Sequence, residues 1–160
     1  MEEAMAELRG QELSPEPDTQ ITMRASAYIP EDYINDPSLR LAAYKEVSSV
    51  GDEAELRDLA EELRDRYGLL PEPAANLFEI MSIKIVAKKA QVARIDAGKS
   101  MVQITFAEDA KISPERVMLL LKKNKGKIKL VPEYTLQLLL GDESLKTASN
   151  AVKKCLQELL

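Results

Sequence analysis

A forced corner between two helical stretches constrains this 160-residue chain more than any other feature of its sequence. The corner reads DRYGLLPEPA and spans residues 65–74. Gly68 stands where a residue with a positive φ commonly ends a helix, while Pro71 and Pro73 block continuation of that helix and suit the start of the next. The sequence therefore predicts an angled helical hairpin, with Gly68, Pro71 and Pro73 as the scaffold of its corner.

Two helices are expected before this corner. Asp36 followed by Pro37 predicts the start of the first, over about residues 37–49, because a carboxylate accepts hydrogen bonds from free amides and proline needs no donor there. Its expected apolar positions are Leu39, Leu41, Ala42 and Val47. Asp52 can cap the second helix, which should run to Tyr67.

The rest of the chain predicts one more long helix and a small sheet. The third helix, over about residues 72–93, carries apolar side chains on more than one side and should be buried centrally. A period of two from residue 20 predicts a strand that Pro30 closes. The other expected elements are two hairpins, around residues 97–100 and Pro132, a helix from Ser113 and a final helix from about Asp142. Because hairpin strands pair antiparallel, we expect an α+β fold, with a small antiparallel sheet of about five strands packed with five to six helices.

The N-terminal end differs in composition from the rest of the chain. Residues 2–9 have a helical pattern that ends at Gly10, and residues 11–18 are polar and contain two prolines, which is typical of a stiff linker. We therefore expect a helix end and linker over residues 1–19 and a folded domain over residues 20–160.

Charge is distributed unevenly along the chain, whose net charge is −5. Residues 1–75 hold 18 Asp and Glu against 7 Lys and Arg, whereas residues 76–160 hold 9 against 15. The first part is therefore strongly acidic and the second mildly basic. This asymmetry favours partners of opposite sign for the two surfaces.

Several kinds of chemistry lack their usual residues in this sequence. The chain has no histidine, a single cysteine (Cys155) and no glycine-rich phosphate-binding loop, which argues against a catalytic triad, a metal site and a nucleotide site. No apolar run approaches the roughly 20 residues that cross a bilayer, and the first residues do not have the pattern of a signal peptide. We expect a cytoplasmic chain that is not an enzyme, does not meet a membrane and takes no cofactor or small-molecule substrate. Cys155 should fill a core position.

One side of the expected second helix is acidic. At 100° per residue, four carboxylates fall within about 100° of one another, opposite a stripe of leucines. These carboxylates, the acidic cluster, are Asp58, Glu61, Glu62 and Asp65. Such a cluster is often an ordinary solvated helix face, but it can also be a docking stripe for a basic partner. The residue pattern alone leaves both interpretations open.

A basic stretch follows the helix that Ser113 opens. Residues 121–129 read LKKNKGKIK, and their five lysines are Lys122, Lys123, Lys125, Lys127 and Lys129. They are weak candidates for phosphate contacts, because the stretch has no aromatic side chain for base stacking and no arginine to read a base edge. Solvated turn lysines are the simpler interpretation.

Two segments of the chain are far more specific than a short motif: AYIPEDYINDPSLRLAAYK and ELRDRYGLLPEPA. They belong to a run, residues 21–80, that resembles the C-terminal domain of the bacterial transcription-repair coupling factors (TRCF). The similarity is tight over about residues 20–95, and the later strands and helix follow the same layout more loosely. Residues 1–10 are similar to the end of the segment that leads out of the motor of those proteins, so we expect the chain to be a piece of a longer protein.

The resemblance implies a parent protein that translocates on double-stranded DNA with ATP, removes stalled RNA polymerase and recruits UvrA in transcription-coupled nucleotide excision repair. It implies that this domain is non-catalytic, docks on the UvrB-like N-terminal module of the same protein, masks the surface that UvrA binds and restrains the motor. The two acidic positions that the family assigns to this docking fall on Glu62 and Asp65. Because both already belong to the acidic cluster, docking is favoured over simple solvation, through ion pairs weak enough to release.

An accessory DNA-binding domain is the alternative function. It would use the five lysines of residues 122–129 to contact phosphates. A salt titration separates the two functions, because phosphate contacts predict an affinity for duplex DNA that falls steeply with salt.

Overall fold

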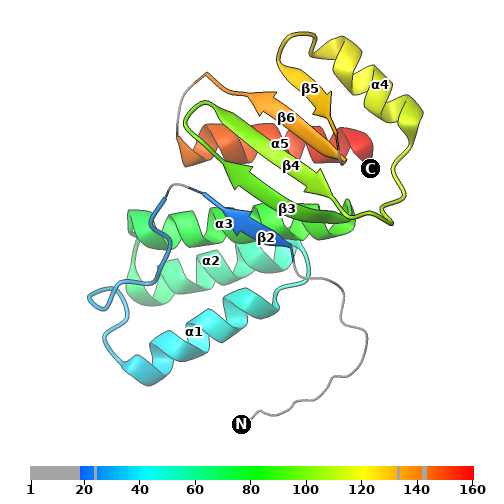
Figure 1. The fold of residues 1–160 in the computed structure, drawn as a ribbon. Coiled ribbons are helices and arrows are strands. Elements are labelled where there is room, and N and C mark those ends of the chain that lie inside the picture. The colour runs from blue at the N-terminus through cyan, green and yellow to red at the C-terminus, as the bar shows by residue number, and fades with distance from the viewer. Residues whose placement is uncertain (1–18, 24, 133, 142–143) are drawn as a thin grey trace.

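The computed structural model of the chain describes residues 19–23, 25–132, 134–141 and 144–160. Over these ranges the sheet and most of the helices lie in separate layers (Figure 1). The expected N-terminal helix end and linker lie outside the described residues, except for Thr19, and the domain boundary at residue 20 therefore stays a prediction.

Three helices follow one another after the first strand. They are α1 (Pro37–Ser49), α2 (Glu53–Tyr67) and α3 (Glu72–Lys89). Asp36 Oδ1 accepts a hydrogen bond from the Ser38 amide at 2.8 Å. Asp52 Oδ1 accepts one from the Glu55 amide at 2.8 Å, so both predicted helix caps are present.

Five strands and two further helices complete the described part of the chain. The strands are β2 (Gln20–Thr22), β3 (Val92–Ala97), β4 (Met101–Phe106), β5 (Ile128–Val131) and β6 (Thr135–Leu139), and the helices are α4 (Pro114–Lys123) and α5 (Leu145–Leu159). Both predicted hairpins, β3–β4 and β5–β6, are present. α5 begins later than residue 142, because the Ser144 hydroxyl caps it by accepting a hydrogen bond from the Thr147 amide at 3.1 Å.

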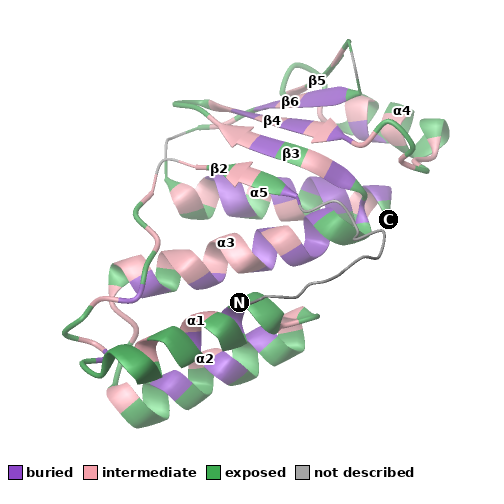
Figure 2. Ribbon diagram, turned by 60° about the horizontal axis from the view of Figure 1, so that its bottom comes forward, coloured by how far each residue is buried: buried purple, intermediate pink, exposed green. Residues whose placement is uncertain are grey.

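The sheet has the strand order β2-β3-β4-β6-β5, and α3 and α5 lie along one of its faces (Figure 2). β3, β4, β6 and β5 pair antiparallel, as predicted, but β2 runs parallel to β3, so the sheet is mixed. Parallel pairing needs a long crossover connection, which the three intervening helices supply and a tight hairpin cannot. The α+β class and the five strands are confirmed, with five helices in the described ranges.

The first strand is shorter than its alternating sequence pattern predicted. Only Gln20–Thr22 pairs with β3, and the pairing stops at Thr22, opposite Asp96, one residue before β3 ends at Ala97. Beyond this point the alternation continues in burial alone, with Met23 partly buried and Ser26 exposed. The period of two therefore indicates a half-buried extended chain, of which only the start forms a strand.

Two hydrophobic cores lie on either side of α3. The sheet core, between the sheet and α5, includes Ile83, Val86, Ile95, Val102, Ile104, Leu120, Leu136, Val152, Cys155 and Leu156. The hairpin core, under α1 and α2, includes Ile34, Val47, Leu56, Leu59, Leu63, Phe78 and Ile85. Because α3 supplies side chains to both cores, it is the central buried helix that the sequence predicted. It ends before residue 93, since Gln91 has a φ of 59° and Val92 already belongs to β3.

α1 buries different residues from those expected. Leu39 and Leu41 are 43% and 56% exposed, and Ala42 is exposed too. Ala43 and Val47 are the buried residues of the helix, so only Val47 was assigned correctly.

Polar anchors explain why α1 turns this side inward. Arg40 Nη1 donates a hydrogen bond to the Ile34 carbonyl at 2.9 Å. The Tyr44 hydroxyl accepts one from the Ile29 amide at 2.7 Å. Apolar periodicity could not reveal this orientation, because arginine and tyrosine make the contacts that fix it.

The α1–α2 hairpin leaves and rejoins the rest of the domain at one place. The Tyr28 amide donates a hydrogen bond to the Pro73 carbonyl at 3.1 Å. Asn76 Nδ2 donates one to the Ser26 carbonyl at 3.0 Å. The two ends of residues 29–72 are therefore held together beside the start of α3.

Candidate functional site

The acidic cluster lies on the outer side of α2. The inner side of this helix is a buried row made by Leu56, Leu59 and Leu63. All four acidic side chains, Asp58, Glu61, Glu62 and Asp65, are exposed. They are therefore accessible to a partner, as docking requires.

Basic residues of the same chain neutralise little of this negative charge. Arg66 Nη1 lies 3.7 Å from Glu62 Oε2, and both side chains are about half exposed. Within the described ranges, Asp58, Glu61 and Asp65 form no ion pair. An exposed ion pair contributes only about 0.2–1 kcal/mol, so the Arg66 contact is readily exchanged for another.

A groove with a volume of about 360 Å³ lies between α1 and α2, and it divides the acidic cluster. Asp58 and Glu62 line this acidic groove, whereas Glu61 and Asp65 do not. Four carboxylates contribute to its lining, namely Glu46, Glu55, Asp58 and Glu62, together with Ser49, Val50 and Leu59. A cationic side chain entering the groove would meet carboxylates around a partly apolar surface.

Sequence reasoning missed two of the groove carboxylates. Glu55 lies three residues before Asp58 and seven before Glu62, a spacing that follows the helical period and could have revealed it. Glu46 belongs to α1, and only the packing of α1 against α2 brings it to the groove. No pattern within α2 could have indicated Glu46.

The predicted corner is present between α2 and α3. Gly68 has a φ of 94°, and its N–H donates to the Arg64 carbonyl at 2.9 Å. Pro71 directly precedes α3, and Pro73 lies in its first turn. A Cβ at Gly68 would meet no atom within 4 Å, so backbone conformation alone favours glycine there.

Tyr33, which sequence reasoning did not single out, supports this corner from the loop before α1. Its hydroxyl donates to the Gly68 carbonyl at 2.8 Å and lies 3.2 Å from the Leu63 carbonyl. Its ring centroid is 5.7 Å from that of Tyr67. A tyrosine phenol is protonated at neutral pH and can donate there, and burial raises the pKa of Tyr33 further.

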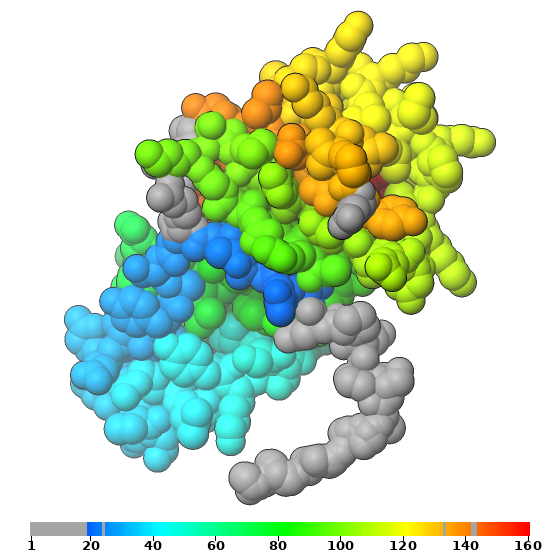
Figure 3. All heavy atoms as spheres, in the orientation of Figure 1, coloured from blue at the N-terminus to red at the C-terminus, as the bar shows by residue number. Residues whose placement is uncertain are grey.

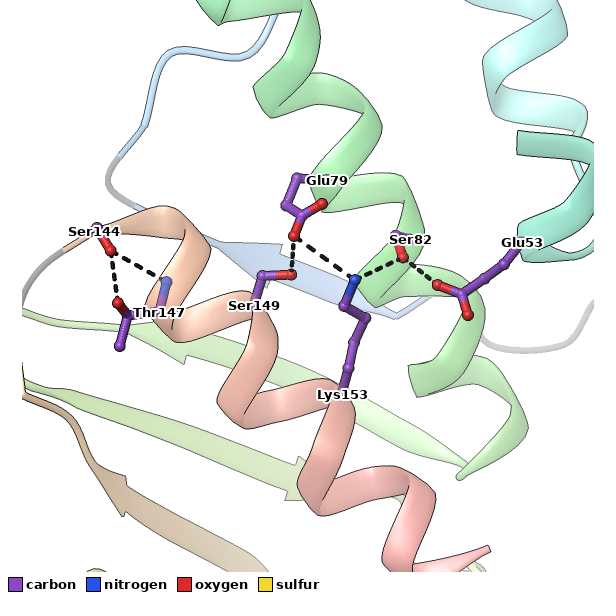
Figure 4. Close-up of polar contacts among 7 residues, drawn as sticks. All are labelled: Glu53, Glu79, Ser82, Ser144, Thr147, Ser149 and Lys153. Atoms are coloured by element: carbon purple, nitrogen blue, oxygen red, sulfur yellow. Dashed lines mark hydrogen bonds and ion pairs between the residues drawn. The ribbon is translucent and has the colours of Figure 1, made fainter. Parts of the chain in front are cut away.

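A polar network joins α2 to the body of the domain (Figure 4). Ser149 Oγ donates to Glu79 Oε1 at 2.7 Å, and Lys153 Nζ lies 3.6 Å from the same oxygen. Lys153 Nζ also donates to Ser82 Oγ at 3.1 Å, and Ser82 Oγ donates to Glu53 Oε1. These contacts tie the first turn of α2 through α3 to α5, which restrains the position of the acidic cluster.

The five candidate lysines lie at the end of α4, along the turn that follows it and, in the case of Lys129, within β5. All have exposed side chains: Lys122, Lys123, Lys125, Lys127 and Lys129. Lys123 Nζ is 3.2 Å from Glu158 Oε1, an ion pair between α4 and α5. The α4 region and the α1–α2 hairpin lie at opposite ends of the face drawn in Figure 3, so the two candidate surfaces are separate.

Neither a metal-binding cluster nor a membrane-spanning helix is found among the described residues. No group of three or more His, Cys, Asp and Glu side chains there could hold a metal ion. Among the described helices, none is both long and apolar enough to cross a membrane.

The amino-acid sequence of the chain is similar to those of several known proteins. A family model described as the TRCF domain matches residues 23–117. The transcription-repair-coupling factor of Haemophilus influenzae is 37% identical over 103 residues, which cover 64% of this chain and 9% of that protein. The Myxococcus xanthus protein of the same name is 32% identical over 136 residues, covering 85% and 11%. The Escherichia coli one is 30% identical over 141 residues, covering 88% and 12%. The chain therefore spans about a tenth of the length of these relatives.

A solved structure has the same fold. It is the crystal structure of the C-terminal domain of a transcription-repair coupling factor, with a TM-score of 0.79 and 20% sequence identity. The match covers 89% of this chain and 91% of that one.

Proposed function

Because this chain belongs to the TRCF domain family, we propose that it is a non-catalytic regulatory domain of a transcription-repair coupling factor. It docks on the UvrB-like N-terminal module of the same protein and masks the surface that UvrA binds. Through this contact it restrains the ATP-dependent DNA translocase that removes stalled RNA polymerase in transcription-coupled nucleotide excision repair. UvrA, RNA polymerase and DNA are thus controlled indirectly, through the rest of the protein.

The exposed acidic surface of the α1–α2 hairpin supports this proposal most directly. Glu62 and Asp65, the positions that the family resemblance assigns to docking, are both exposed. Glu46 and Glu55 extend the negative charge from Glu62 across the acidic groove towards α1. A surface of this kind fits a partner that presents arginine or lysine side chains.

Weak ion pairs suit a contact that must open. Each exposed pair contributes only about 0.2–1 kcal/mol, so several together supply on the order of a few kcal/mol. Within one protein, the covalent connection raises the effective concentration of the partner, so even this small energy holds the closed state. A competing ligand such as UvrA can then displace the domain.

Charge reversal in the full-length protein tests this function. The double variant E62K/D65K should expose the UvrA-binding surface, and UvrA should then bind several-fold more tightly in a pull-down or titration. The matched control is E108K/D109K, which changes the net charge equally at two exposed carboxylates in the turn that follows β4. Unchanged UvrA binding by E62K/D65K, or an equal gain in the control, would contradict the proposal.

The accessory DNA-binding function keeps one supporting observation, the exposure of all five lysines between residues 122 and 129. It predicts that this chain binds duplex DNA with an affinity that falls steeply as salt rises. The docking function predicts negligible binding of DNA by the chain and weak, salt-sensitive binding of the separately expressed UvrB-like module.

A further inference from the structure

A cleft with a volume of about 620 Å³ lies between the α1–α2 turn and the second half of α3. Its lining residues are Ser48, Val50, Gly51, Met81, Lys84, Ile85, Lys88 and Lys89. All of the charged residues in this lining are lysines, so we name it the basic cleft. Val50 lines both the acidic groove and the basic cleft, which places two hollows of opposite charge next to each other.

Stabilisation of the helix end explains only part of this arrangement. Lys88 and Lys89 lie in the last turn of α3, where positive charge interacts favourably with the helix dipole. Lys84 lies one turn earlier and lines the same cleft. Within the described part of the chain, the Lys89 ammonium takes part in no ion pair. Stabilisation of the helix end therefore accounts for the positions of Lys88 and Lys89 but not for that of Lys84.

We propose that the basic cleft receives the acidic N-terminal segment of this same chain, residues 1–18. This segment has one basic residue, Arg9, and six carboxylates: Glu2, Glu3, Glu7, Glu12, Glu16 and Asp18. Its part nearest the described domain also contains one large apolar residue, Leu13, which suits the apolar lining of Val50, Met81 and Ile85. The inference concerns a different surface from the acidic groove and does not rest on the proposed docking function.

The point where the segment joins the described domain lies close to the lysines. Thr19 is buried, and its Oγ1 donates to the Val92 carbonyl at 2.8 Å. Val92 follows Lys88 by four residues, which span at most about 14 Å of extended chain. Glu16, three residues before Thr19, can extend up to about 10 Å from it. With the lengths of the glutamate and lysine side chains added to these spans, the carboxylates nearest Thr19 are within range of the basic cleft.

A tethered acidic segment fits the cleft better than a nucleic acid does. A long polyanion in the cleft would also approach the carboxylates of the neighbouring acidic groove, such as Glu46 and Glu55, and would be repelled by them. A short segment can present a few carboxylates to the cleft and avoid the groove. Because it is attached at Thr19, it also has a high effective concentration there.

A spin label on the segment tests the proposal in the whole chain. The S14C variant can be labelled selectively, because Cys155 is buried and its thiol pKa is raised to about 12. The label should strongly broaden the amide signals of Gly51, Met81 and Ile85, which line the cleft, in nuclear magnetic resonance spectra. The broadening should fall several-fold in about 0.5 M salt, where the Debye length is roughly 4 Å.

Two charge variants separate docking in the cleft from general proximity. K84Q/K88Q/K89Q and the reciprocal E12Q/E16Q/D18N should each abolish most of the broadening and leave the dispersed spectrum of a folded domain. The control K122Q/K123Q/K125Q removes the same charge elsewhere and should leave the broadening unchanged. The proposal is overturned if both test variants keep the broadening, or if a short DNA duplex binds the chain and loses affinity only in K84Q/K88Q/K89Q.

Discussion

The sheet core and the hairpin core of this domain are enclosed to different degrees. Side chains of the sheet core such as Val102 and Leu156 have no exposed surface, because strands cover them on one side and α5 on the other. In the hairpin core, the leucine row of α2 keeps a small exposure, 6% at Leu56 and 7% at Leu59, and the outer sides of α1 and α2 are largely exposed. The candidate docking surface belongs to this less enclosed region. The more enclosed sheet core therefore stabilises the fold, while the outer side of the α1–α2 hairpin is exposed and carries charge.

The largest effect should come from a cavity in the sheet core. Ile104 has no exposed surface and lies between Ile95 and Leu136 of the neighbouring strands. I104A should lower the free energy of unfolding by about 2–5 kcal/mol, measured by urea denaturation. It should also accelerate thiol labelling of Cys155, which is buried in the same core. A variant with unchanged labelling would show that Cys155 does not report on this core.

A cavity in the hairpin core sharpens the comparison. L59A should cost about 2–3 kcal/mol, near the lower end for such substitutions, because a core close to the surface relaxes more easily. Amide hydrogen exchange should accelerate in α1 and α2, while the labelling rate of Cys155 stays near that of the parent chain. Equal acceleration in both regions would contradict their separation.

The corner itself should show a smaller effect. G68A forces a side chain onto a residue with a φ of 94° and should cost about 1–3 kcal/mol in thermal or urea unfolding. The matched control is G98A, whose Cβ would make an ordinary contact at 3.5 Å with the Met101 carbonyl oxygen. If both variants lose the same stability, the conformation at Gly68 is not what matters.

The smallest expected effect is a gain in stability. Asp58 lies three and four residues before Glu61 and Glu62, so like charges repel along α2. D58N should raise the free energy of unfolding by about 0.2–0.5 kcal/mol at low salt, and the gain should vanish as salt screens the charges. D109N, at an exposed position outside any helix, should change nothing. A loss of stability in D58N would mean that Asp58 has a structural role.

Local chemistry made the corner and the helix caps predictable. Gly68, Asp36 and Asp52 each make their hydrogen bonds with residues a few positions away, so a short stretch of sequence is enough to predict them. The inward side of α1 could not be predicted, because it depends on contacts of Arg40 and Tyr44 with a loop. The parallel pairing of β2 is equally nonlocal, since it depends on where three helices return the chain.

In the candidate site too, the residues within one helix could be predicted, and those that come from other segments could not. The carboxylates within α2 follow the helical period, and the sequence identified four of them. Glu46 and Tyr33 come from segments that only the folded chain brings to α2. Sequence periodicity describes one helix at a time, whereas a groove needs two.

The hydrogen bonds that join Tyr28 to Pro73 and Asn76 to Ser26 close residues 29–72 at their base. The α1–α2 hairpin is thus an insert whose two ends are neighbours. Closing a loop costs little more when the loop is lengthened, so this insert can change in length or sequence while the strands behind it keep their register. The family model matches this whole module, so its neighbouring ends serve to hold one surface at a fixed angle to the sheet.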